Sequence, residues 1–259
     1  MRFGILGSGS RGNAALIESG ATTLMLDAGF SARETVLRLA RLNRSGEQIS
    51  AILITHEHGD HCRGVVSCAR QFDVPVWMTA GSLSAMKDDV RDSLDIHLIN
   101  PHEVFSIGDI EVQPFPVPHD AREPCQFVFS DGDTRLGFLT DTGSITTHIE
   151  AMLNGCEALV LECNHDLGML RDGPYSPSLK ARVGGNLGHL DNATTARLLR
   201  RLESSCIRHI VAAHLSETNN TPELARAALA RAFDCDPSFI EVADQEVGLP
   251  FRNISEAWV

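Results

Sequence analysis

Long apolar runs, paired cysteines and lysines are scarce in this sequence of 259 residues, and each shortage narrows the class of protein. No stretch approaches the roughly 18 apolar residues of a transmembrane helix, so we expect no membrane span. The apolar stretch at the N-terminus is too short for a secretory signal peptide. The seven cysteines include no CxxC pair, which predicts reduced thiols in a cytoplasmic protein.

Positive charge is also scarce, because the formal net charge is −12 and only Lys87 and Lys180 are lysines. Proteins that bind nucleic acid normally carry a basic surface, so the net negative charge does not by itself indicate a nucleic-acid-binding protein. The other cations are arginines, which can bind phosphate in bidentate fashion. Two arginine clusters, at 38–44 and 197–201, are each predicted to be the solvated face of a helix.

The order of strands and helices is similar in the two halves of the chain. Each half begins with short apolar segments separated by turns and then alternates helices with strands. We predict strands at 3–6, 14–18, 22–26, 51–54, 75–79, 96–99, 104–106, 110–115, 126–130, 135–140, 158–162 and 209–212, and helices at 31–42, 64–72, 145–153, 191–202 and 222–233. This order suggests an α/β protein with two mixed sheets face to face and helices outside, a four-layer αββα sandwich forming one domain over residues 1–259.

Two of the predicted helices carry start signals. Ser31 can cap the helix at 31–42, and Glu34 lies three residues on, as a capping box requires. The apolar face of this helix is expected to consist of Val36, Leu37 and Leu39. Thr221 and Pro222 suit the N-cap and first position of the last helix.

The stretch ITHEHGDH, residues 54–61, places three histidines and two carboxylates directly after an apolar run. A zincin metalloprotease needs H-E-x-x-H on a helix, but here Asp60 stands four residues after His56, in a loop that follows a strand. In an extended loop His56 and His58 point the same way, whereas Asp60 and His61 turn towards a second point. One tetrahedral ion takes about four ligands, so this HxHxDH loop suggests two metal ions.

Four further polar residues follow apolar runs of strand character. They are Asp27, His119, Asp141 and His214. Sites in α/β folds lie just beyond the carboxyl ends of strands, so we expect these residues to meet the HxHxDH loop and to complete the set of metal ligands.

Together these residues resemble the metallo-β-lactamase-fold hydrolases, whose motifs occur here in order over nearly the whole chain. The resemblance implies that His56, His58 and His119 bind one metal ion, that Asp60, His61 and His214 bind another, that Asp141 bridges the two, and that Asp27 hydrogen-bonds the HxHxDH loop. It implies two divalent ions per chain. Zinc is the first candidate, and manganese or iron are alternatives, because such ligand sets accept several metals.

A closer resemblance is to the YycJ-type (WalJ) subfamily of these hydrolases. It rests on the segments 7–13, 161–166, 188–190 and 214–220, which read GSGSRGN, LECNHD, GHL and HLSETNN. The subfamily often has serine after Gly-His-Leu, where this chain has Asp191, which can equally cap the next helix. The subfamily is similar in turn to RNase Z and to the cyclic phosphodiesterases of phosphonate metabolism, all of which attack phosphodiesters. The chain lacks the insertions of the β-CASP nucleases and the arm of RNase Z.

The subfamily resemblance also suggests catalytic residues. It places His189 near the scissile phosphate, with Glu162 and His165 beside it, and gives Asp60 a role in orienting the nucleophile. In the segment 7–13, which is not a Walker loop because it lacks GK[ST], the alternatives are a plain tight turn and a substrate contact. The substrate-binding candidates there are Ser8, Ser10, Arg11 and Asn13, of which Arg11 is expected to meet phosphate.

These patterns predict a dinuclear metal-dependent hydrolase, and specifically a phosphodiesterase or exonuclease that acts on nucleic acid through a metal-bridging hydroxide. A thioesterase of the glyoxalase II type, or a lactonase, would use the same metal motifs on a carbonyl centre. The motifs around His165 and His189 favour phosphodiesters over these alternatives. A diiron oxidoreductase would need a carboxylate where His58 stands.

Overall fold

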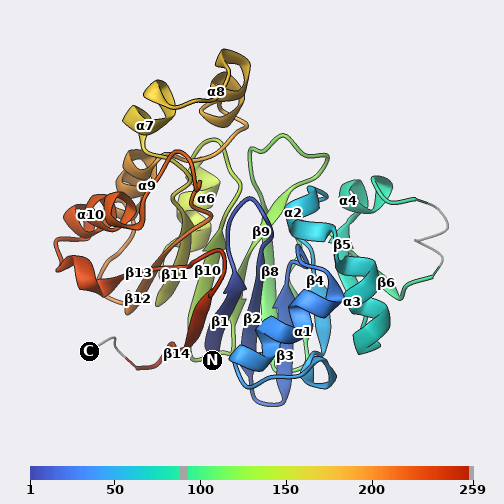
Figure 1. The fold of residues 1–259 in the computed structure, drawn as a ribbon. Helices are drawn as coiled ribbons and strands as arrows, with labels where there is room; N and C mark the ends of the chain where they lie inside the picture. Colours follow the sequence, from blue (N-terminus) through green and yellow to red (C-terminus); the bar gives the residue numbers. More distant parts are fainter. Residues whose placement is uncertain (88–92, 257–259) are drawn as a thin grey trace.

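Two β-sheets lie face to face in the computed structural model of this chain, and helices cover their outer sides (Figure 1). The structure describes residues 1–87 and 93–256. The first sheet has the order β14 (Leu249–Asn253), β1 (Arg2–Gly7), β2 (Ala14–Ser19), β3 (Thr22–Leu26), β4 (Ala51–Leu53), β5 (Val76–Thr79), β6 (Ile96–Ile99). The second has the order β13 (Ile240–Val242), β12 (His209–Ala213), β11 (Ala158–Glu162), β10 (Arg135–Leu139), β9 (Cys125–Ser130), β8 (Ile110–Pro116), β7 (Phe105–Ile107).

Each sheet is antiparallel where its first strands pair and parallel where its later strands pair. β1, β2 and β3 are antiparallel, and β3 to β6 are parallel. In the same way β7 to β10 are antiparallel and β10 to β13 are parallel. The chain finally returns to the first sheet, where β14 pairs with β1. Parallel strands end at the same edge, so the loops after β3 and β4 emerge at one edge of the first sheet and those after β10, β11 and β12 at one edge of the second.

The helices and three apolar clusters complete four layers. The longer helices are α1 (Ala32–Arg41), α3 (Val65–Phe72), α9 (Asn192–Leu199) and α10 (Pro222–Phe233), and the shorter ones are α2 (Gly59–Cys62), α4 (Ala80–Ser84), α6 (Thr147–Leu153), α7 (Leu167–Asp172), α8 (Pro177–Val183), η1 (Gly46–Gln48) and η2 (Pro237–Phe239). One cluster fills the space between the sheets. A second lies between α1, α3 and the first sheet, and a third between α6, α9, α10 and the second sheet. The predicted αββα sandwich is thus confirmed.

The buried face of α1 differs from the predicted one. Leu39 is buried as expected, but Val36 and Leu37 are 37% and 52% exposed. The face on the sheet instead includes Thr35 and Arg38, three residues apart and therefore on one side of the helix. The prediction was wrong because it counted apolar side chains and overlooked that an arginine can be buried when its N–H groups are bonded.

Arg38 also corrects the prediction that the cluster at 38–44 is a solvated helix face. Its side chain is 4% exposed, and its guanidinium lies over the ring of Phe30 at 4.0 Å. Its Nη1 donates to the carbonyl oxygens of Leu6 and Gln245, both at 2.8 Å. The buried charge is therefore held by directed bonds that join α1 to the first sheet and to the loop before β14.

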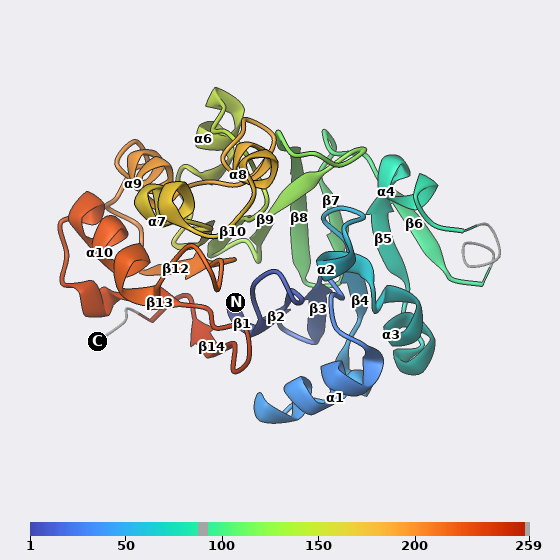
Figure 2. The ribbon, with the colours of Figure 1, turned by 45° about the horizontal axis from the view of Figure 1, so that its top comes forward.

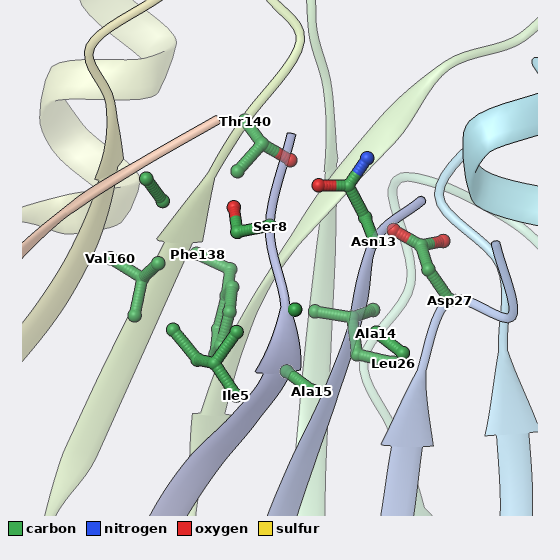
Figure 3. A pocket seen from close by; sticks show the side chains of 12 residues that line it. Ile5, Ser8, Asn13, Ala14, Ala15, Leu26, Asp27, Phe138, Thr140 and Val160 are labelled. Atoms are coloured by element: carbon green, nitrogen blue, oxygen red, sulfur yellow. The ribbon is translucent and has the colours of Figure 1, made fainter. Parts of the chain in front are cut away.

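The interior changes from apolar to polar towards the end of the sandwich where the parallel strands stop. A small cavity of about 20 Å³ between the sheets marks the change (Figure 3). Its lower part is lined by the apolar side chains of Ile5, Leu26, Phe138 and Val160, and its upper part by Ser8, Asn13, Asp27 and Thr140. Such a volume can hold a single water molecule.

Within the described residues, no helix is both long enough and apolar enough to cross a membrane. All seven cysteines are unpaired, as the absence of a CxxC pair led us to expect. The single domain over residues 1–259 stays a prediction, and it includes residues 88–92 and 257–259, which lie outside the described residues.

Candidate metal centre

The candidate site lies at the end of the sandwich where the parallel strands stop. α7 and α8 stand over the ends of the second sheet, and α2 over those of the first (Figure 2). Asp27 and His214 directly follow β3 and β12, and Asp141 lies two residues after β10. All three have positive φ angles, of 60°, 55° and 51°. Residues other than glycine adopt this backbone only where other contacts hold it, so the three turns are fixed by their surroundings.

His56, His58 and His119 form a first group of side chains able to hold a cation, with ligand atoms within 4.8 Å of one another. Their ring centroids lie 4.6, 4.9 and 5.0 Å apart. Thr55 Oγ1 lies 3.0 Å from His56 Nδ1, and the oxygen of Gly188 lies 3.0 Å from His119 Nδ1. The other nitrogen of His56, Nε2, is buried without a hydrogen-bond partner among the described residues. An orphaned nitrogen that faces two more imidazoles fits a metal ligand.

Asp60, His61 and His214 form a second group, and Asp141 makes a third with His56 and His61. Asp141 Oδ2 lies 3.1 Å from His61 Nε2 and 2.8 Å from His214 Nδ1. Burial alone would raise the pKa of Asp141, but His214 and His61 hold that pKa well below its usual value. The structure therefore places an ionised carboxylate in contact with His61 and His214 of the second group and within 4.8 Å of the ligand atom of His56 in the first. All seven residues predicted as ligands come together at this end of the molecule.

Asp27 supports the HxHxDH loop from the end of β3. Its Oδ2 lies 2.7 Å from His61 Nδ1, and its Oδ1 accepts a bond of 2.9 Å from the backbone N–H of Thr55. The Thr55 hydroxyl contacts both carboxylate oxygens of Asp27. It also contacts Nδ1 of His56, which belongs to the first group of candidate ligands. The expected contact between Asp27 and the loop is thus present, and it fixes which nitrogen of His61 faces the site.

Ser8 and Asn13, predicted to bind substrate, are buried beneath the site. Ser8 Oγ accepts a bond of 2.8 Å from the backbone N–H of His214. Asn13 Nδ2 lies 3.0 Å from His61 Nε2 and 3.3 Å from Asp60 Oδ2. Both side chains are less than a tenth exposed, so they are placed to hold candidate ligands in position rather than to meet a substrate.

Ser10 and Arg11, the other two candidates from this turn, lie in different surroundings. Ser10 lines a cavity of about 410 Å³ that also contains Asp60, His214 and other candidate ligands. Arg11 lines a separate cavity, and its Nη2 lies 2.6 Å from carboxylate oxygens of both Glu217 and Glu246. Two carboxylates already surround the Arg11 guanidinium, and this arrangement argues against the predicted phosphate contact.

His189 stands at the edge of the metal cluster, and Glu162 holds it there. Its ring centroid lies 5.3 Å from those of both His119 and His214. Glu162 is fully buried, and its Oε1 lies 2.7 Å from His189 Nδ1. Burial alone would lower the pKa of His189, but Glu162 and the nearby aspartates raise it to about 9. The remaining nitrogen, Nε2, has no hydrogen-bond partner in the part of the chain that the structure describes.

His165 is separate from the metal cluster. It is buried, forms a β-bridge with Asp191, and lines a second cavity, which His189 also lines. Burial lowers the pKa of its ring. The structure therefore brings His165 to the same cavity as His189, and within the described residues His165 belongs to none of the groups able to hold a cation.

Three residues at the site were not predicted from the sequence. Asp120 Oδ1 lies 3.6 Å from His119 Nε2, and Asp120 Oδ2 lies 2.7 Å from Arg182 Nε. Arg182 and Tyr175 belong to the segment around α8 that lines the cavity of about 410 Å³. The position of Asp120 directly after His119 is a signal that could have found it, whereas Arg182 and Tyr175 lie in no recognisable motif.

The αββα fold and the cluster of histidines and aspartates at its strand ends define a metal-dependent hydrolase. Residues 22–215 match the Beta-lactamase superfamily domain. The chain is 35% identical to "Exodeoxyribonuclease YycJ" of Bacillus anthracis, over 90% of this chain and 89% of that protein. It is 33% identical to "Exodeoxyribonuclease WalJ" of Streptococcus pneumoniae serotype 2, over 97% of this chain and 92% of that protein. The chain therefore belongs to the metallo-β-lactamase superfamily and, within it, to the YycJ-type proteins.

Solved structures agree with the fold. Zn(2+)-bound PqqB from Methylobacterium extorquens superimposes with a TM-score of 0.75 at 20% identity, over 98% of this chain and 100% of that one. At this identity the likeness concerns the fold alone. Both the fold class and the family expected from the sequence are confirmed.

Proposed function

We propose that this protein is a phosphodiesterase that degrades nucleic acid as an exonuclease with two divalent cations. One cation would be held by His56, His58 and His119, the other by Asp60, His61 and His214, with Asp141 between them. Imidazole and carboxylate ligands suit zinc first, and manganese or iron as well. When bound, the two cations would generate hydroxide from water at neutral pH and offset charge on the phosphoryl oxygens.

Side chains of the protein would supply the other functions: orienting the nucleophile, protonating the leaving group and binding the substrate. Asp60 is partly exposed in the cavity and would orient the attacking oxygen. His189, with Nδ1 bound to Glu162, would present its Nε2 to the leaving oxygen and give it a proton. Glu162 is a positioning residue, since it is fully buried and reaches the reaction only through His189. Ser10 lies in the same cavity, where it can bind the substrate.

The observation that carries the proposal is the place of His189. The buried Glu162 carboxylate holds His189, the proton donor, in place. The ring centroid of His189 lies 5.3 Å from those of two candidate ligands, His119 and His214. Phosphodiester cleavage needs such a donor for the departing alkoxide. The names of the two relatives, both called exodeoxyribonucleases, support nucleic acid as the substrate. The free thiols suit the reducing cytoplasm, which we propose as the location.

The test uses two substrates and two ligand variants. Metal-loaded protein should hydrolyse bis-p-nitrophenyl phosphate and shorten oligonucleotides from an end, and both activities should be lost in His58→Ala and Asp60→Ala. The same preparations should be tested on a thioester and a lactone. Cleavage of either of these without cleavage of a phosphodiester would contradict the proposal and favour carbonyl chemistry at the same centre.

A further inference from the structure

A second cavity, of about 350 Å³, adjoins the metal site through His189, whose side chain lines both. Its walls come from the loop at 143–145, from residues 184–190, and from α9. Candidate metal ligands line the first cavity, whereas the second is lined by His165, His189, two arginines, one aspartate and neutral residues. The volume is in the range of pockets that bind small ligands.

The cations of this second cavity are Arg197 and Arg201, from the end of α9 and just beyond it. Arg197 Nη2 donates to Thr194 Oγ1 at 2.6 Å, and within the described residues it has no carboxylate partner. Arg201 pairs with Glu150, but its side chain remains 63% exposed. Both arginines were predicted to belong to a solvated helix face, yet the structure places them beside a cavity that opens at His189.

The cavity also has one carboxylate, that of Asp191, but this group is engaged elsewhere. Asp191 caps α9, and its Oδ1 accepts from the backbone N–H groups of Ala193 and Thr194 at 2.8 and 3.0 Å. Its Oδ2 accepts from the hydroxyl of Thr194. Asp191, the only acid among the described lining residues, therefore uses most of its hydrogen-bonding capacity to cap the helix. The two guanidinium groups still have N–H donors available for an anion.

We propose that this cavity binds a phosphate group of the substrate strand on the leaving-group side of the scissile bond. The proposal rests on the proposed function, because His189 can protonate the leaving oxygen only if the leaving strand continues past its ring. Beyond that ring lie Arg197 and Arg201, whose planar guanidinium groups match phosphate oxygens. Leu167 of α7, which is 56% exposed and also lines the cavity, offers apolar contact to the adjoining sugar or base.

This subsite also accounts for how a chain with net charge −12 can act on a polyanion. The substrate need only meet positive charge locally, at the metal cluster and at the two arginines beyond His189. The subsite would make the protein selective for polynucleotides over small phosphodiesters, since only a strand with a further phosphate reaches both the metal cluster and the two arginines.

The experiment compares the double variant Arg197→Gln/Arg201→Gln with metal-loaded wild-type protein on two substrates. For a single-stranded oligodeoxynucleotide we expect kcat/KM to fall at least about tenfold and to depend less steeply on salt concentration. For bis-p-nitrophenyl phosphate, whose leaving group carries no phosphate, we expect a change of no more than about twofold. Arg200→Gln is the matched control, because Arg200 is exposed at the C-terminus of α9 and is not a lining residue of the cavity.

The two substrates separate this proposal from the proposed function. An unchanged kcat/KM for the oligonucleotide in the double variant overturns the subsite, as does an equal loss on both substrates. In either case shortening of the oligonucleotide and cleavage of bis-p-nitrophenyl phosphate by wild-type protein leave the proposed function standing. Wild-type protein that cleaves neither phosphodiester overturns both.

Discussion

At the scale of single residues, the site is built on backbone torsions that are unfavourable by themselves. Asp27, Asp141 and His214 are all left-handed, and each such residue costs about 1–3 kcal/mol. Their contacts offset this cost, as when Ser8 Oγ accepts the N–H of His214. The pattern of a polar residue after an apolar strand predicted where these side chains lie. It could not predict their torsions, which depend on contacts made by residues far away in the sequence.

The role of His189 can be tested by removing its ring. In His189→Ala we expect metal content to match wild type, because among the described residues the hydrogen bond of this ring goes to Glu162, and its contact with the candidate ligand Asp141 is a longer one of 3.5 Å. We expect kcat to fall roughly 10²–10⁴-fold, the usual contribution of a general acid. Elemental analysis and steady-state kinetics are the measurements, and His102→Ala, at an exposed position, is the control. Loss of metal in His189→Ala would instead make it a ligand.

Asp131 offers a test of how pH affects stability. Burial raises the pKa of its carboxyl, but the Met1 amino group at 2.6 Å and bonds from Thr134 outweigh this and lower the pKa below its usual value. A lowered pKa stabilises the fold above about pH 4, where unfolded aspartate is also ionised, and this contribution disappears as the pH falls further. Asp131→Asn should therefore cost about 1–2 kcal/mol at pH 7 and less at pH 3, where the unfolded carboxyl is largely protonated while the folded one stays ionised.

Urea unfolding at both pH values measures this difference between Asp131→Asn and wild type. Asp133→Asn, at an exposed position of the same turn, is the matched control. A destabilisation of Asp131→Asn that is as large at pH 3 as at pH 7 would show that the carboxylate charge is not the cause.

At the scale of elements, the sequence predicted long and well-capped segments better than short ones. The helix predicted at 222–233 has the bounds of α10, and Thr221 accepts from Leu224 N as its cap. The sequence did not predict α2, α4, α7, α8, β13 and β14, and α2 places Asp60 and His61 on a short helix where a loop was expected. α8 begins with a cap and proline, Ser176 and Pro177, that could have been recognised. β13 has three residues and β14 contains a proline, so neither has a pattern that distinguishes a strand from a loop.

The close packing of the HxHxDH loop on its neighbours predicts a large effect for one glycine. A Cβ atom at Gly29 would overlap the backbone oxygen of Asp60 and the backbone nitrogen of Asn13. These segments are joined by backbone bonds, including Asn13 N to Asp60 O at 2.8 Å. Gly29→Ala should therefore displace the loop, lower the free energy of unfolding by about 1–3 kcal/mol and reduce metal content.

Gly59→Ala is the matched control for Gly29→Ala in stability and metal content, since apart from its chain neighbours and its own helix no atom of the described residues lies within 4 Å of a Cβ built at Gly59. Urea unfolding and elemental analysis of the two variants side by side are the measurements. If the two variants behave alike, the loop does not depend on the close approach at Gly29.

At the scale of the whole molecule, the site exists only because the two sheets are packed together. The first sheet supplies Asp27 and the HxHxDH loop, and the second supplies His119, Asp141 and His214. The sequence showed all of these residues and their order, which is why the family resemblance could assign them. It could not show the cavities on either side of His189, because their walls combine α8, α9 and loops that are distant along the chain.

Because ligands from both sheets meet, bound metal should stabilise the whole fold. A ligand present at a hundred times its Kd stabilises a protein by about 2.7 kcal/mol, so removal of the metal with a chelator should lower Tm by roughly 5–10 °C. Zinc should restore the Tm, and protein purified without chelator should hold about two metal ions per chain. Chelator saturated with calcium beforehand is the control. One ion or none per chain with full activity, or an unchanged Tm after complete removal, would contradict a dinuclear centre between the sheets.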